Sequence, residues 1–142
     1  MNTIEERIKQ TYAQLNSETV HSDLLAQLYA EDIQFIDPLH AMSNREQLKD
    51  YFINLYRNVE HIHFNFTSHI SSENTVFLTW IMTFRHPKLN GGKDITVPGT
   101  SHIKHNDQYI TFHQDYFDST HMLFSQIPVL KNIINAIKNR LN

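Results

Sequence analysis

The sequence predicts an α+β fold in which helices pack on one face of an antiparallel sheet and a last helix closes it. Two observations support this prediction. Apolar residues recur at helical spacing up to about residue 58 and again from residue 126. Between residues 61 and 118, apolar and polar residues alternate as they do in half-buried strands. At 142 residues, the chain has the length of one domain, spanning 1–142, with a single core.

Two of the predicted helices begin at capping-box patterns. Thr3 is followed three residues later by Glu6, and Ser43 by Glu46. The predicted helices span residues 3–15, 22–30, 43–58 and 126–141. The last of them carries an apolar stripe, so we expect it to close over its own sheet or over a dimer interface.

The predicted strands span residues 33–36, 61–70, 75–85, 95–105 and 109–118. The first strand ends at Asp37-Pro38 because proline cannot donate to a ladder and restricts the residue before it. The turn at 106–107 suggests that the last two strands form an antiparallel hairpin. In strand 75–85, Phe77 and Ile81 face away from the main apolar face. We therefore expect either that both faces are covered or that these residues contact a second subunit.

Composition excludes several classes of protein. The chain has no cysteine, which excludes disulfides and thiolate chemistry and suggests a reducing, cytoplasmic location. The N-terminus lacks the apolar segment of a secretory signal, and no apolar run approaches the ~20 residues that a membrane span needs. The formal net charge is −3 with dispersed Lys and Arg, so we expect no nucleic-acid partner.

The stretch HQDYFD, residues 113–118, is the strongest candidate for a functional site. Strand alternation places His113, Asp115 and Phe117 on one face. Same-face spacing predicts that the His113 and Asp115 side chains lie roughly 6–7 Å apart, close enough for a ligand or water to bridge them. The alternatives are a solvated strand end or an Asp115 paired with a neighbouring Arg or His.

Four other residues have a functional and a structural interpretation. Asp37 either lines the pocket or is a turn residue whose carboxylate caps backbone N–H groups. Tyr12 lies on the apolar stripe of its helix, where it is either core or a ligand contact. Trp80 and Met82 share one strand face, and they form either the floor of the pocket or plain core.

The spacing His61-x-His63 is the one metal-like pattern in the chain. Two histidines on one strand face can share a metal ion, but no third ligand joins them in the sequence. We therefore interpret them as the wetter face of a half-buried strand and expect no metal.

The order of elements, with YAEDIQFIDP at residues 29–38 and HQDYFD at 113–118, resembles the SnoaL-like branch of the nuclear transport factor 2-like superfamily. This branch includes ketosteroid isomerases, polyketide cyclases and limonene epoxide hydrolases, and the resemblance covers about residues 12–118. It implies a cone-shaped curved sheet wrapped by helices around a deep apolar pocket. It leaves the reaction open, because this fold hosts many chemistries and also proteins without catalysis.

The resemblance to the isomerases implies roles for three residues. Asp37 matches the position of their general base, and Tyr12 falls near their oxyanion tyrosine. Ser101 aligns with their second oxyanion acid, so a hydroxyl stands here in place of a carboxyl group.

The resemblance to the other two groups centres on Asp115. It matches the carboxylate on the final strand of the epoxide hydrolases, whose Arg and second Asp fall at Trp80 and Met82. The polyketide cyclases rely mainly on one acid or base carboxylate in the pocket, a role that Asp115 can fill.

We therefore expect a small-molecule enzyme that performs acid–base chemistry, without a cofactor, on an apolar or aromatic oxygenated ligand. The expected catalytic residues are Asp115, His113 and Asp37. The expected ligand-binding residues are Tyr12, Phe52, Trp80, Met82, Ser101 and Phe117. The alternative is a non-catalytic ligand-binding or dimerisation module. In either case we expect a homodimer.

Overall fold

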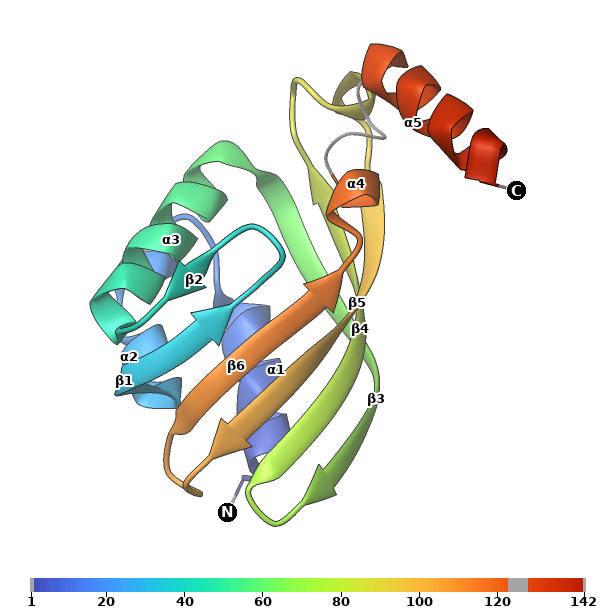
Figure 1. The fold of residues 1–142 in the computed structure, drawn as a ribbon. Helices are drawn as coiled ribbons and strands as arrows, with labels where there is room; N and C mark the ends of the chain where they lie inside the picture. Colours follow the sequence, from blue (N-terminus) through green and yellow to red (C-terminus); the bar gives the residue numbers. More distant parts are fainter. Residues whose placement is uncertain (1, 123–127, 142) are drawn as a thin grey trace.

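The computed structural model describes residues 2–122 and 128–141, which form helices followed by a curved sheet (Figure 1). The helices are α1 (Ile4–Gln14), α2 (Leu24–Leu28), α3 (Arg45–Asn58), α4 (Ser119–Met122) and α5 (Pro128–Leu141), with short 3₁₀ helices at Thr19–His21 and Asn90–Gly92. The strands are β1 (Tyr29–Ile36), β2 (Ala41–Met42), β3 (Glu60–Ser72), β4 (Thr75–Arg85), β5 (Ile95–His105) and β6 (Ile110–Phe117). The predicted α+β class is confirmed.

The described strands form one sheet in the order β2-β1-β6-β5-β4-β3. Strands β3 to β6 are joined by antiparallel pairings, as the alternation predicted. In contrast, β1 pairs parallel with β6, which the sequence did not indicate. The two strands are far apart in the sequence, and only tertiary packing brings them together.

Helices α1, α2 and α3 cover the inner face of the sheet (Figure 1). The capping box at the start of α1 forms as predicted: the Thr3 hydroxyl accepts from the Glu6 N–H, and the Glu6 carboxylate accepts from the Thr3 N–H. Ile8 of α1 and Leu48 of α3 are buried against the inner face, together with Leu78 of β4. The core therefore lies between these helices and the sheet, and it surrounds the site described below.

Several predicted boundaries differ from the structure, among them the junction of α2 with β1 and the start of α3. The predicted helix 22–30 ends at Leu28, and β1 begins at Tyr29, four residues before the predicted strand. Helix α3 is capped by Asn44 instead of Ser43, because the Asn44 side chain accepts from the Gln47 N–H. Both Ser43 and Asn44 are good capping residues, so propensity does not choose between them.

Helix α5 projects away from the sheet at one end of the molecule (Figure 1). Its described side chains, at residues 132–141, are exposed or half-buried, with Ile133, Ile137 and Leu141 all exposed. The helix therefore leaves its exposed apolar residues open to solvent. The expectation that it closes over the sheet of its own chain is wrong. Residues 126 and 127, where this helix was predicted to begin, lie outside the described residues.

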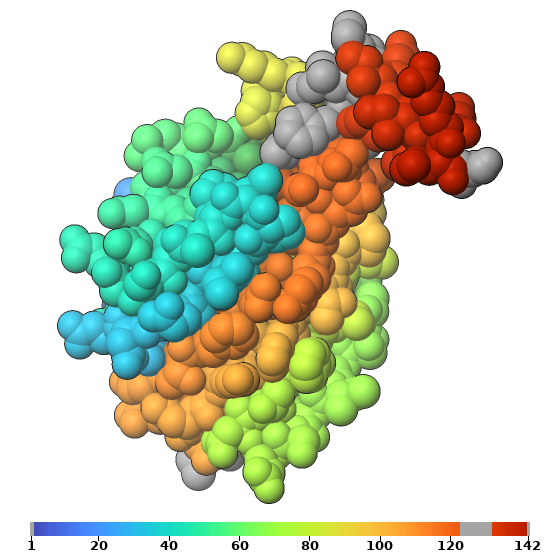
Figure 2. Space-filling model, in the orientation of Figure 1, coloured from blue at the N-terminus to red at the C-terminus, as the bar shows by residue number. Residues whose placement is uncertain are grey.

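The outer face of the sheet is open (Figure 2), where side chains of β1, β6, β5 and β4 form the surface. On β4, Phe77 is 44% exposed and Ile81 is 36% exposed. The expectation that both faces of β4 are covered is therefore wrong within one chain. The other expectation, contact with a second subunit, stays a prediction.

Candidate functional site

Strands β5 and β6 place three polar side chains on the inner face of the sheet. Ser101 of β5 lies opposite Asp115 of β6 in the antiparallel register. The side chain of His113 is 3% exposed and that of Asp115 is 16% exposed. The interpretation of this stretch as a solvated strand end is therefore wrong, and the predicted inward orientation is confirmed.

His113 and Asp115 are in direct contact. The distance from His113 Nε2 to Asp115 Oδ1 is 2.7 Å, so the predicted separation of roughly 6–7 Å is wrong. The prediction used the backbone spacing along a strand, whereas both side chains are long enough to lean toward each other across it. No ligand is needed to bridge the two groups.

Ser101 also bonds to Asp115, and Trp80 in turn bonds to Ser101. The indole N–H of Trp80 can only donate, and it lies 2.9 Å from Ser101 Oγ. The Ser101 hydroxyl donates in turn to Asp115 Oδ1 at 2.5 Å. Ser101 and His113 therefore both bond to Oδ1, and neither bond uses Oδ2.

Two tyrosines extend the hydrogen-bonded chain on the His113 side. Tyr29 Oη lies 2.9 Å from His113 Nδ1 and 2.7 Å from Tyr12 Oη. An ionised Asp115 can only accept, so Nε2 of His113 carries the proton of that bond. With His113 neutral, Nδ1 accepts from Tyr29, and Tyr29 accepts from Tyr12. All these hydrogen bonds therefore run toward Asp115.

Tyr12 and Tyr29 both remain protonated at neutral pH. Burial raises the pKa of the Tyr12 hydroxyl well above its ordinary value, with further contributions from Tyr29 and Asp115. Burial likewise raises the pKa of the Tyr29 hydroxyl. Each hydroxyl therefore has one hydrogen to donate and lone pairs to accept.

The hydrogen-bonded group borders a small internal cavity. Tyr12, Trp80, Ser101, His113 and Asp115 line it, together with Ile8, Phe64 and Phe66. Its volume is about 10 Å³, which is close to the space that one water molecule needs. A larger ligand would have to displace neighbouring side chains, of which Phe64 and Phe66 are only half-buried.

Three predicted ligand contacts lie around this cavity instead of lining it. The ring of Phe52 packs edge-on against Tyr12, with centroids 6.1 Å apart, and the ring of Phe117 lies 6.3 Å from that of Trp80. Met82 lines a separate apolar groove of about 100 Å³, which also includes Leu55. Met82 and Phe117 pack against both apolar clusters of the core.

Asp37 has its own set of partners in the turn after β1. Its Oδ1 accepts from the backbone N–H groups of Leu39 and His40, at 2.8 and 2.7 Å. Its Oδ2 accepts from the Tyr51 hydroxyl at 2.6 Å. The capping interpretation of Asp37 is therefore confirmed, and Asp37 does not line the inner cavity.

Tyr29 is the member of the group that the sequence did not indicate. The sequence pattern predicts it near the end of a short helix, and it is instead the fully buried first residue of β1. The available signal was the polar end of a large aromatic side chain, which needs a partner once it is buried.

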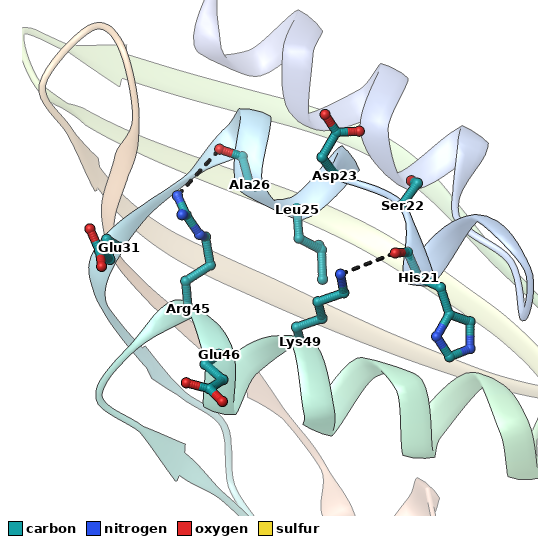
Figure 3. Close-up of a pocket in the computed structure, with 9 residues that line it drawn as sticks. All are labelled: His21, Ser22, Asp23, Leu25, Ala26, Glu31, Arg45, Glu46 and Lys49. Atoms are coloured by element: carbon teal, nitrogen blue, oxygen red, sulfur yellow. Dashed lines mark hydrogen bonds between the residues drawn. The ribbon is translucent and has the colours of Figure 1, made fainter.

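A larger surface depression of about 460 Å³ lies between α2 and α3 (Figure 3). Its two cations bond to backbone carbonyls: Arg45 donates to Ala26 and Tyr29, at 3.5 and 3.2 Å, and Lys49 donates to His21 at 3.1 Å. These bonds satisfy carbonyl groups around α2, so we assign this depression a structural role.

Neither a metal site nor a membrane-spanning helix is found in the part of the chain that the structure describes. Residues 2–122 and 128–141 contain no cluster of three or more His, Cys, Asp or Glu side chains placed to hold a metal ion. None of the described helices is long and apolar enough to cross a membrane.

Comparisons with known proteins identify the family. A family model for the SnoaL-like domain matches residues 8–113, whereas no curated protein matches the sequence. A structure from Catenulispora acidiphila, described as a ketosteroid isomerase-like fold in complex with trimethylamine, is 18% identical with a TM-score of 0.73; the match covers 87% of this chain and 90% of that one.

A candidate SnoaL-like polyketide cyclase from Shewanella putrefaciens is 18% identical with a TM-score of 0.72, over 91% of this chain and 98% of that one. A similar candidate from Jannaschia is 13% identical with a TM-score of 0.72, over 87% and 90%. These structures share the fold, and the family match covers most of the chain. The chain belongs to the SnoaL-like domain family.

Proposed function

We propose that this chain is a cofactor-free enzyme in which Asp115 accepts or donates a proton on a small apolar or aromatic oxygenated ligand. One observation carries the proposal. Ser101 and His113 both bond to Oδ1 of Asp115, so neither of these bonds uses Oδ2. The same carboxylate group lines an internal cavity. A fixed carboxylate with one uncommitted oxygen in a mostly apolar site suits general acid–base catalysis.

The other residues have supporting roles in this proposal. His113 and Ser101 orient the carboxylate, and Trp80 orients Ser101. Tyr12 borders the cavity and can contact the ligand. The proposal gives Asp37 no proton transfer, because its two oxygens already accept from the turn and from Tyr51.

The test begins with native mass spectrometry of the purified chain, to detect a ligand that copurifies. That ligand, with a panel of small cyclic ketones and epoxides, is then incubated in heavy or ¹⁸O-labelled water, and product mass reports the incorporated label. Asp115→Asn should lower the rate at least about 100-fold, the lower range for general acid–base groups. Asp32→Asn, at an exposed position on β1, is the matched control and should retain the full rate. Equal rates in wild type and Asp115→Asn would remove Asp115 as the acid or base.

The size of the cavity favours a second candidate function, a non-catalytic module. At about 10 Å³ the cavity admits water but no larger ligand without rearrangement, and a buried hydrogen-bonded network can serve to fix the arrangement of a core. Under this function, the chain copurifies with no ligand and none of the panel compounds acquires label.

A further inference from the structure

The described hydrogen-bond donors around the inner cavity are committed to other residues. The Trp80 N–H bonds to Ser101, and the Ser101 hydroxyl bonds to Asp115. His113 donates its Nε2–H to Asp115, and its Nδ1 accepts from the Tyr29 hydroxyl. With Asp115 ionised and His113 neutral, this pattern satisfies every one of these groups at once.

The same pattern fixes the direction of the Tyr12 hydroxyl. Tyr29 donates to His113, so its oxygen is left to accept, and Tyr12 is the donor 2.7 Å away. Tyr12 thus gives its one hydrogen to Tyr29 and keeps lone pairs for the cavity that it lines. The polar groups left for an occupant are the Asp115 Oδ2 and the Tyr12 oxygen, and both accept hydrogen bonds.

We infer that the cavity selects a hydrogen-bond donor: a water or hydroxyl group, or a protonated amine, that donates to Asp115 and to Tyr12. The inference deepens the proposed function and rests on it for any turnover. It restricts Asp115 to accepting a proton from an O–H or N–H group, either of the ligand or of a water molecule that attacks the ligand. It excludes anions and enolate-like oxygens as occupants in this state, because no donor is free to stabilise them.

Tyr29 is the positioning residue for this selectivity. It touches no occupant, since it does not line the cavity, but it takes the hydrogen of Tyr12. Tyr29→Phe removes the oxygen that accepts from Tyr12. The Tyr12 hydroxyl is then free to donate into the cavity, so this variant should gain the ability to bind an acceptor.

The first test needs no ligand. Long-range ¹H–¹⁵N NMR of the imidazole at pH 8 should show His113 as the tautomer protonated on Nε2. A His113 protonated on Nδ1 would overturn the inference, because Tyr29 and Tyr12 would then donate in the opposite direction and Tyr12 would offer its hydrogen to the cavity. This result is independent of any catalytic activity, so it separates the inference from the proposed function.

The second test uses two water-sized probe ions at pH 8, ammonium as a donor and fluoride as an acceptor. Ammonium should cause saturable NMR shifts at His113 and Tyr12, and fluoride should cause none. Asp115→Asn should weaken ammonium binding at least tenfold, and Tyr12→Phe should weaken it to a smaller extent. Tyr116→Phe, on the exposed outer face of β6, is the matched control and should bind as wild type does.

Tyr29→Phe should keep ammonium binding and acquire saturable fluoride binding. Circular dichroism confirms that this variant is folded before the titration, and Tyr12→Phe provides the comparison in which no tyrosine hydroxyl can turn toward the cavity. Saturable fluoride binding to the wild type would contradict the inference, as would ammonium binding that Asp115→Asn leaves unchanged.

Discussion

Ser101 links two parts of the buried polar group through a single hydroxyl. It accepts the Trp80 N–H and donates to Asp115 Oδ1, and it is itself buried. Removing this hydroxyl deprives a buried donor and a carboxylate of one partner each. A buried polar group left without a partner costs more stability than a satisfied bond contributes.

Ser101→Ala should therefore lower the free energy of unfolding by about 1–3 kcal/mol, the cost of one such unsatisfied group. Urea denaturation measures this change. Thr100→Ala, the neighbouring residue on the outer face of β5, is the control and should stay within about 0.5 kcal/mol of wild type. If the two variants lose the same stability, the hydroxyl of Ser101 has no special role in the site.

Part of the candidate site could be predicted from single residues. Strand alternation correctly placed His113 and Asp115 on one face, because that period depends only on the backbone. The contact between His113 and Asp115 depends on side-chain rotamers, which the pattern does not report. The role of Tyr29 depends on partners 17 and 84 positions away, and no local pattern contains them.

Gly99 shows how β4 and β5 together position the site. It pairs with Trp80 across these strands, and the indole ring occupies the space where a side chain at Gly99 would lie. A Cβ built at this position would meet three Trp80 ring atoms at 2.2–2.6 Å, far inside van der Waals contact. The missing side chain therefore lets Trp80 lie flat enough to reach Ser101.

Gly99→Ala should displace the Trp80 ring and cost about 1–3 kcal/mol, as overpacking in a core does. Trp80 is the one tryptophan of the chain, so intrinsic fluorescence reports its displacement directly, and urea denaturation gives the stability change. In a Trp80→Leu background the same substitution should cost clearly less, because the clashing ring is absent. Additive costs in the double variant would contradict the clash.

Elements were predictable where they depend on local pattern. The capping box of α1 and the antiparallel run from β3 to β6 follow from residues close in the sequence. The pairing of β1 with β6 does not, because these strands are joined by neither a hairpin turn nor a single crossover helix. The two-residue strand β2 is too short to produce an alternating pattern.

At the scale of the whole molecule, apolar side chains gather on the outer face of the sheet. Ile70 of β3 lies opposite Phe77 of β4, and the Phe77 ring stacks on His102 of β5, with centroids 4.4 Å apart. Ile81 lies opposite Pro98, further along the same pair of strands. Exposed apolar groups that extend across neighbouring strands are typical of surfaces that bind another protein.

We predict that two copies of the chain associate through this outer face. A stable interface of about 1,200–2,000 Å² would cover Phe77 and Ile81 in both copies and remove them from water. Light scattering after gel filtration should therefore give twice the 16.8 kDa mass of the chain. Ile81→Glu should shift the mass to that of the monomer, because a charge buried without a partner is strongly unfavourable. Leu39→Glu, an equally drastic change at an exposed leucine between β1 and β2, should leave the dimer intact.

A monomeric wild type would refute the dimer itself. A dimer that survives Ile81→Glu and is lost in Ile137→Glu would instead assign the contact to α5, whose apolar side is also exposed.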